Sequence, residues 1–197
     1  MTSMSQVCAG DSTDRVMKLT EAHSRYPNDA DGAPYDEVFI AVQAAVERSA
    51  SVGKYEIGAL MLWKRLTLSS RWTRELNNMG DQQVRAITAS AIALARDKSL
   101  AIPEGARAAR QALTGLPGCR HGNAVASTIL TAGAPGRMAI YDVRAVAALN
   151  RLKCPDPEGN YGKYMTTVAS LVSEVNSCGL SWCPRDVDKA LYMLAIS

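Results

Sequence analysis

The chain has 197 residues, which is enough for one compact domain or two closely packed lobes. Its hydrophobic content of 47% and charged content of 21% are typical of a globular protein. No apolar run of about eighteen residues predicts a membrane span. The formal net charge of +3 neither requires nor excludes nucleic acid as a partner, so local clustering of charge matters more.

The N-terminal segment, residues 1–33, is polar and runs into the loop-forming sequence PNDADGAP. We predict a short helix at 15–24 within a segment that is otherwise flexible or loosely packed. The chain does not start with basic residues followed by an apolar core, so we expect no secretory signal. Five cysteines, an odd number without a regular framework, favour a reduced, cytoplasmic protein.

Hydrophobic residues recur at helical spacing through the remaining residues, 34–197. The clearest stripes lie at 38–46, 57–61, 84–94, 164–175 and 187–194. Asp81, Pro103 and Pro184 stand at expected helix starts, and Gly179 stands at an expected end. Alternating strand patterns are nearly absent, so the sequence predicts an all-α fold of about nine or ten helices.

The stretch from 113 to 152 carries the most informative pattern. A short helix leads into a Leu-Pro-Gly turn at 116–118, a polar hairpin at 119–122 and an apolar helix, which is the order of a helix-turn-helix unit. A Gly/Pro break at 133–136 and a short extended piece follow. They lead to Asp142, which we expect at the start of another helix.

These residues resemble the helix-hairpin-helix DNA glycosylases, whose Leu-Pro-Gly hairpin is followed by a small-residue helix and then by an aspartate that opens the next helix. The family hairpin usually has a second glycine where Arg120 stands, and the spacing to Asp142 is slightly longer here. Gly122 occupies the position of the Schiff-base lysine of bifunctional members. The resemblance implies a two-lobed, multi-helix domain over 34–197, with the helix-hairpin-helix at 113–133, that excises a base without that lysine.

Asp142 is the first candidate catalytic residue. Cleavage of an N-glycosidic bond passes through a positively charged, oxocarbenium-like sugar, which a nearby carboxylate stabilises while it orients the attacking water. The alternative is that Asp142 only caps its helix, because aspartate is a favoured N-cap residue. Asparagine caps about as well as aspartate, so the two roles can be separated by one substitution.

The hairpin is the second candidate, as a grip on the DNA backbone. Glycine permits a positive φ and a close approach, so the amides of Gly118, Arg120 and Gly122 are well placed to hold a phosphate. Arg120, His121 and Arg144 can add charge-assisted contacts that position the protein without reading sequence. The alternative is a plain turn between two helices.

The third candidate is the segment WKRLTLSSRWTR at 63–74, which joins Lys64, Arg71 and Arg74 to two tryptophans. Basic and aromatic residues together suit phosphate contact and stacking on an extruded base. The resemblance implies that this segment lines the base pocket, so we expect Trp63, Trp72 and Tyr141 there. The alternative is a solvated helix face with its aromatic residues turned to the core.

Lys64 has a further candidate role. A lysine at the end of an apolar helix face can be desolvated and can then act as an amine nucleophile. Most lysines in such positions instead extend their ammonium group to water.

We expect no metal and no cofactor. Some glycosylases of the family bind an iron–sulfur cluster through four C-terminal cysteines. Here Cys154, Cys178 and Cys183 are spaced differently, and His23 and His121 do not form a metal-ligand spacing with any cysteine pair.

The sequence therefore predicts a monofunctional DNA glycosylase, a monomer of the nucleoid-containing cytoplasm. It would act on double-stranded DNA with a damaged or modified base and leave an abasic site, without any contact with membranes. The substrate base cannot be read from the sequence. Two alternatives stay open: a non-catalytic helix-hairpin-helix module with salt-dependent DNA binding, and an all-helical protein-interaction domain.

Overall fold

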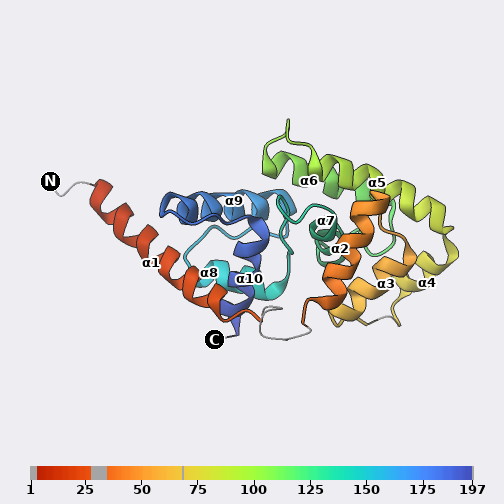
Figure 1. Ribbon diagram of the computed structural model, residues 1–197, viewed down its shortest axis with the longest axis horizontal. Coiled ribbons are helices and arrows are strands. Elements are labelled where there is room, and N and C mark those ends of the chain that lie inside the picture. The colour runs from red at the N-terminus through yellow and green to blue at the C-terminus, as the bar shows by residue number, and fades with distance from the viewer. Residues whose placement is uncertain (1–3, 28–34, 68, 197) are drawn as a thin grey trace.

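The computed structural model of the chain describes residues 4–27, 35–67 and 69–196 (Figure 1). Every regular element in these ranges is a helix, which confirms the predicted all-α fold. The helices are α1 (Met4–Ser24), α2 (Glu37–Ser49), α3 (Lys54–Trp63), α4 (Arg71–Asn78), α5 (Asp81–Arg96), α6 (Ile102–Ala112), α7 (Ala124–Gly133), α8 (Val143–Arg151), α9 (Tyr161–Ser177) and α10 (Pro184–Ala195). A 3-10 turn, Leu113–Gly115, follows α6. None of the described helices is both long and apolar enough to span a membrane.

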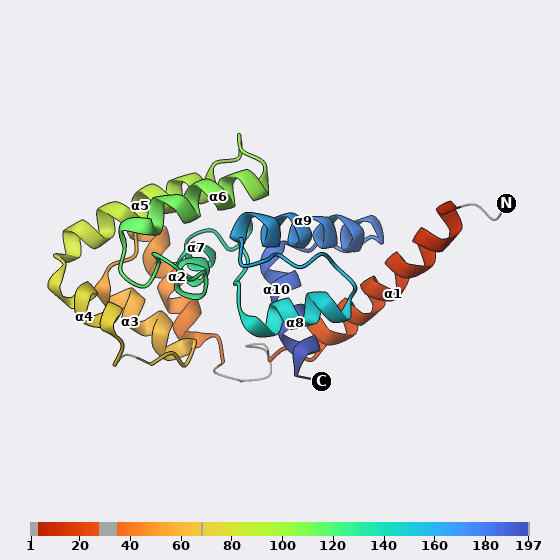
Figure 2. The same cartoon turned by 180° about the vertical axis from the view of Figure 1, so that it is seen from behind.

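The helices form two groups that lie side by side (Figures 1 and 2). One group contains α2 to α7, with α5 and α6 packed against each other. The other contains α1 and α8 to α10, with α1 and α8 both packed against α10. Contacts between α6 and α9 join the two groups. The first group ends with α7 and the second resumes at α8, so the segment 134–142 crosses between them.

Helix α7 lies at the centre of the core, and all of its residues from Val125 to Gly133 are buried. Its sequence, AVASTILTAG, has no charged residue and many small ones, as expected for a helix that is packed on every side. A Cβ atom on Gly133 would lie 2.6 Å from Cγ1 of Ile92 on α5, so only glycine permits this close packing.

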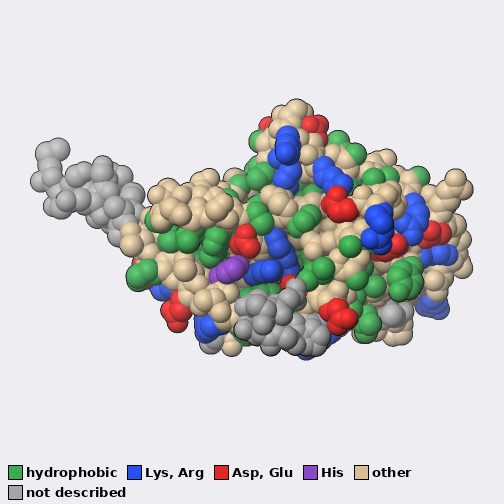
Figure 3. Space-filling model, viewed as in Figure 1, with side chains coloured by type: hydrophobic (Ala, Val, Ile, Leu, Met, Phe, Trp, Pro, Cys, Tyr) green, Lys and Arg blue, Asp and Glu red, His purple; other side chains and the backbone are tan. Residues whose placement is uncertain are grey.

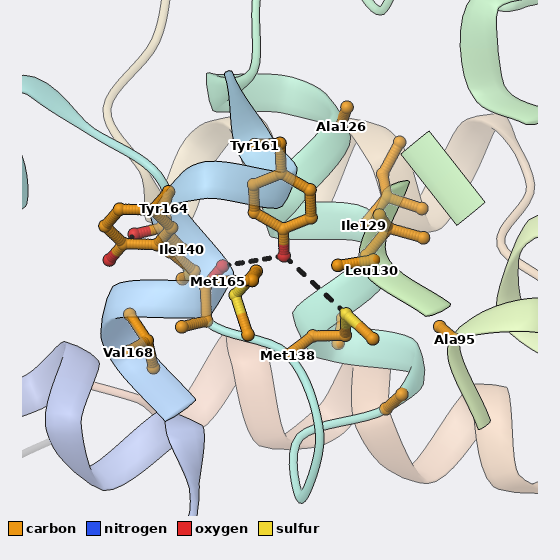
Figure 4. Packing of buried hydrophobic residues seen from close by; sticks show 14 of the residues in the cluster. Ala95, Ala126, Ile129, Leu130, Met138, Ile140, Tyr161, Tyr164, Met165 and Val168 are labelled. Carbon is orange, nitrogen blue, oxygen red and sulfur yellow. Dashed lines mark hydrogen bonds between the residues drawn. The ribbon is translucent and has the colours of Figure 1, made fainter. Parts of the chain in front are cut away.

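The segment before α8 is held in place by two buried tyrosines of α9, Tyr161 and Tyr164 (Figure 4). The hydroxyl of Tyr161 donates to the carbonyl of Ala139, and that of Tyr164 donates to the carbonyl of Ile140, each at 2.9 Å. Buried backbone carbonyls need such partners in an irregular segment. These bonds set the position at which Asp142 follows.

The N-terminal helix is longer and better packed than the sequence predicted. Val16, Leu19 and Ala22 of α1 are buried, and Arg15 forms an ion pair with Glu174 of α9. The sequence pattern has few apolar residues at helical spacing in this region. It therefore predicted only a short helix in a loosely packed segment. Residues 28–34, where the loop-forming sequence falls, lie outside the described residues.

Candidate functional site

A cavity of about 550 Å³ lies between the two helical groups. From the first group it is lined by 63–66 at the end of α3 and by 122–124 at the end of the hairpin, which we call the hairpin wall. The opposite side is formed by Arg185, Asp188 and Tyr192, which we call the α10 wall. Residues 140–144, Tyr26 and Tyr35 complete the lining. The cavity thus brings together residues that are far apart in sequence.

Asp142 is the N-cap of α8 and also lines the cavity. Its Oδ1 accepts hydrogen bonds from the backbone N–H groups of Arg144 and Ala145, each at 2.9 Å. Its Oδ2 lies 3.3 Å from Nζ of Lys64. One carboxylate oxygen therefore serves the cap and the other faces a cation, so capping and a chemical role are compatible.

Lys64 follows the last residue of α3, and its backbone N–H donates to the carbonyl of Leu60. Its side chain is only 11% exposed, compared with 24% for Asp142, so the pair is partly shielded from water. An ammonium and a carboxylate at this distance stabilise each other more strongly than an exposed pair does. The structure therefore brings together the two predicted catalytic residues.

Two of the three predicted aromatic residues line the cavity. Trp63 packs on Phe39, with ring centroids 4.7 Å apart, and its Nε1 donates to the carbonyl of Tyr35. Tyr141 meets Tyr164 edge-on, with centroids 5.0 Å apart, and its backbone N–H donates to Oγ of Ser127. These contacts hold both side chains at the cavity, where flat apolar surfaces suit an aromatic ligand.

Trp72 lies elsewhere, and its predicted place in the base pocket is corrected by the structure. It does not line the cavity but packs under the hairpin. Gly118 has a φ of +86°, and a Cβ atom there would lie 2.7 Å from Cε3 of Trp72. The break between α3 and α4 separates the two tryptophans of the 63–74 segment, which composition alone did not reveal.

The hairpin is anchored at its end toward the cavity. Arg110 of α6 donates to Oδ1 of Asn123 at 2.9 Å and to the carbonyl of Gly122 at 3.1 Å. The Nδ2 group of Asn123 donates to the carbonyl of Gly159, in the second helical group. Gly122 lies at the cavity, while His121 is exposed beside it.

The remaining predicted DNA contacts lie at the surface, and some are already paired. Arg71 and Arg120 both form ion pairs with Glu75, and Arg74 is exposed. Arg144 is exposed at the cavity rim and lies over the ring of Tyr192, with its Cζ 5.2 Å from the ring centroid. Figure 3 shows basic side chains interspersed with acidic ones on one face of the molecule. Among the predicted contacts, Gly122 and Arg144 line the cavity, whereas Gly118, Arg71, Arg74, Arg120 and His121 do not.

The sequence interpretation missed a buried charged network at the α10 wall. Arg185 bonds to Asp188 on the next turn of α10, to the hydroxyl of Tyr26 at 3.2 Å and to Asp36 at 3.3 Å. All four residues are less than 9% exposed. Arginine and aspartate three residues apart share a helix face, but this spacing is ordinary for surface helices, so it did not distinguish a buried pair.

No group of three metal-ligating side chains forms among the described residues. The thiol of Cys119 is buried, and this burial raises its pKa to about 12. A thiol with so high a pKa is a poor nucleophile at neutral pH. The chain matches no protein-family model, no curated protein and no solved structure. The functional argument therefore depends on the geometry of the cavity.

Proposed function

We propose that the protein is a DNA glycosylase that accepts a damaged or modified base, flipped out of duplex DNA, in the cavity between its two helical groups. It would act as a monomer on DNA in the cytoplasm. The observation that supports this proposal is the Asp142–Lys64 pair at 3.3 Å, which faces a cavity bounded by Trp63, Tyr141 and the end of the hairpin. A paired carboxylate beside apolar ring faces suits a reaction that separates an aromatic leaving group from a cationic sugar.

In the proposed reaction, the bond between C1′ of the deoxyribose and the base breaks, and its electron pair leaves with the base. The sugar becomes an oxocarbenium ion, and Asp142 stabilises its positive charge. A carboxylate at roughly 4 Å in an effective dielectric of about 20 contributes about 4 kcal/mol. That corresponds to about a thousandfold in rate. Water then adds to C1′ and loses a proton, which leaves an abasic site.

The other parts of the site have supporting roles in this proposal. Lys64 orients Asp142 before DNA binds, because its Nζ lies 3.3 Å from Oδ2 of the carboxylate. The backbone amides around Gly122 and the guanidinium of Arg144 are suited to the phosphates beside the flipped nucleotide. Arg71, Arg74 and Arg120 can add weaker contacts further along the duplex.

The test is a panel of duplexes that carry uracil, alkylated, oxidised or hydroxymethylated bases, treated with alkali after incubation. We expect strand breaks with at least one base for the parent protein and a loss of about a thousandfold for Asp142→Asn, with little change in melting temperature. Asp97→Asn is the matched control, because Asp97 accepts a hydrogen bond from the backbone N–H of Ser99 outside the cavity. It should cut like the parent.

The other outcomes correspond to the alternatives. Unchanged cutting by Asp142→Asn would mean that Asp142 is only a helix cap. Salt-sensitive binding of every duplex without breaks would indicate a non-catalytic DNA-binding module. Neither binding nor breaks would favour a protein-interaction domain.

A further inference from the structure

The α10 wall adds a second acidic residue, Asp188, to the cavity lining. Asp188 is only 4% exposed, and it is one of the residues that line the cavity. It lies opposite the hairpin wall and belongs to a different helix from Asp142. Lys64 and Asp142 nevertheless affect the pKa of Asp188. Burial raises the pKa of Asp188, Arg185 opposes this effect, and smaller contributions come from Asp142, which raises it, and Lys64, which lowers it.

Arg185 fixes the position of this carboxylate. One of its terminal nitrogens donates to Oδ2 of Asp188, and the other lies between Tyr26 and Asp36. Its guanidinium also packs over the rings of Phe39 and Trp63, with Cζ 4.9 and 5.5 Å from the centroids. A guanidinium with this many contacts cannot turn toward a ligand without breaking buried interactions. Arg185 is therefore a positioning residue for Asp188.

The other carboxylate oxygen of Asp188 remains available. Within the described part of the chain, Asp188 accepts a hydrogen bond only at Oδ2. An ionised carboxylate can only accept hydrogen bonds, and it has capacity for about four. Arginine stays protonated at all ordinary pH values, so its contact favours this ionised form. A ligand that reaches Asp188 must therefore offer hydrogen-bond donors.

The three kinds of base edge differ in the donors and acceptors that they offer. A guanine-type edge carries two adjacent donors, the ring N1–H and the 2-amino group, which match one carboxylate. Adenine and cytosine place an amino donor beside a ring nitrogen that accepts. Uracil and thymine have one N–H between two carbonyl oxygens. A carboxylate repels these oxygens because they carry partial negative charge. Unpaired polar groups in a buried site strongly disfavour the wrong ligand.

We infer that Asp188 is a specificity-determining residue of the proposed glycosylase, and that it selects purines with a guanine-type edge, namely oxidised or alkylated guanines. This inference rests on the proposed function and names its substrate class. The sugar of the flipped nucleotide would lie at Asp142, the base between the rings that line the cavity, and its N1–H and 2-amino groups at Asp188.

The first experiment needs no mutation. The kcat/KM for base release is compared between duplexes with 8-oxoguanine and with 8-oxohypoxanthine, which lacks only the 2-amino group, and with uracil as a third substrate. A hydrogen bond to a charged group is worth about 1.5–3 kcal/mol, so we expect at least about a tenfold preference for 8-oxoguanine. Uracil should be released more slowly than either purine.

The second experiment removes the acceptor charge. Asp188→Asn should bring the ratio between the two purines close to one, because the single amide oxygen is needed for Arg185 and the amide NH2 group then offers donors, not acceptors, to the base. Asp186→Asn is the control on the same helix. The Asp186 carboxylate accepts from the backbone N–H of Cys183 outside the cavity, and an asparagine can keep that bond. This control should retain the preference. If Asp188→Asn does not fold, the ratio measured with the parent protein decides alone.

The outcomes separate the inference from the proposed function. Base release that depends on Asp142 but prefers uracil, or does not distinguish the two purines, would overturn the role of Asp188 and leave the glycosylase intact. Retention of the preference in a folded Asp188→Asn protein would overturn it as well. A lack of base release from every duplex would remove the proposed function and the inference together.

Discussion

The two walls of the cavity are built in different ways. On the hairpin wall, the side chain of Lys64 contacts Asp142, and that of Asn123 contacts Arg110 and the carbonyl of Gly159. On the α10 wall, Arg185 is buried and contacts side chains from three separate parts of the chain. A single charge on the hairpin wall can therefore change with little effect on folding, whereas removal of the buried Arg185 charge from the α10 wall should destabilise the protein strongly. Mutations can test this difference directly.

The largest expected effect is at Arg185. Its replacement by leucine leaves Asp36 and Asp188 buried without their cation, and such a loss costs about 3–5 kcal/mol. We expect a clear drop in the free energy of unfolding by urea. Arg144→Ala is the control, because Arg144 is exposed and contacts mainly Tyr192, so it should cost less than about 1 kcal/mol. Equal stability of the two variants would mean that the buried contacts of Arg185 are not needed for the fold.

The second effect concerns the hairpin turn. Gly118→Ala places a Cβ atom against Trp72 at a positive φ, and we expect a loss of about 1–3 kcal/mol in unfolding free energy. A Cβ atom on Gly122 meets nothing within 4 Å, so Gly122→Ala should lie within about 0.5 kcal/mol of the parent. If both variants lose the same stability, then neither the positive φ at Gly118 nor its close contact with Trp72 requires a glycine there.

The smallest effect on folding is expected for Lys64→Gln, at about 1 kcal/mol, since Asp142 keeps its two backbone hydrogen bonds. Thermal melting at neutral pH measures it. The same variant addresses the chemistry. With water as the nucleophile, borohydride should trap no covalent adduct between the parent protein and DNA. An adduct that forms with the parent but not with Lys64→Gln would make Lys64 an amine nucleophile.

The fold was largely predictable because the signals are local. Apolar residues at helical spacing predicted the all-α class, and the Gly/Pro break before Asp142 predicted its place at the start of α8. Helix α1 was underpredicted because its buried stripe has few apolar residues. The helix-hairpin-helix resemblance, the DNA contacts and the activity stay predictions that the experiments above address.

The site was only partly predictable because it depends on contacts between distant residues. Lys64 and Asp142 were both chosen from their surroundings in the sequence, but nothing in the sequence showed that they meet. Trp72 was misplaced because the separation of α3 from α4 follows from tertiary packing. Asp188 and Arg185 were missed since their roles depend on Asp36 and Tyr26, more than a hundred residues earlier.

The contact between Arg185 and the early residues Tyr26 and Asp36 also bears on synthesis of the protein. These partners are separated by 159 and 149 positions, so every residue up to Arg185 must leave the ribosome before they can meet. Until then Asp36 lacks its ion pair with Arg185, and the ring surfaces of Phe39 and Trp63 lack the guanidinium that covers them. The nascent chain therefore cannot close this cavity until α10 has been made, even though α2 to α7 are made much earlier.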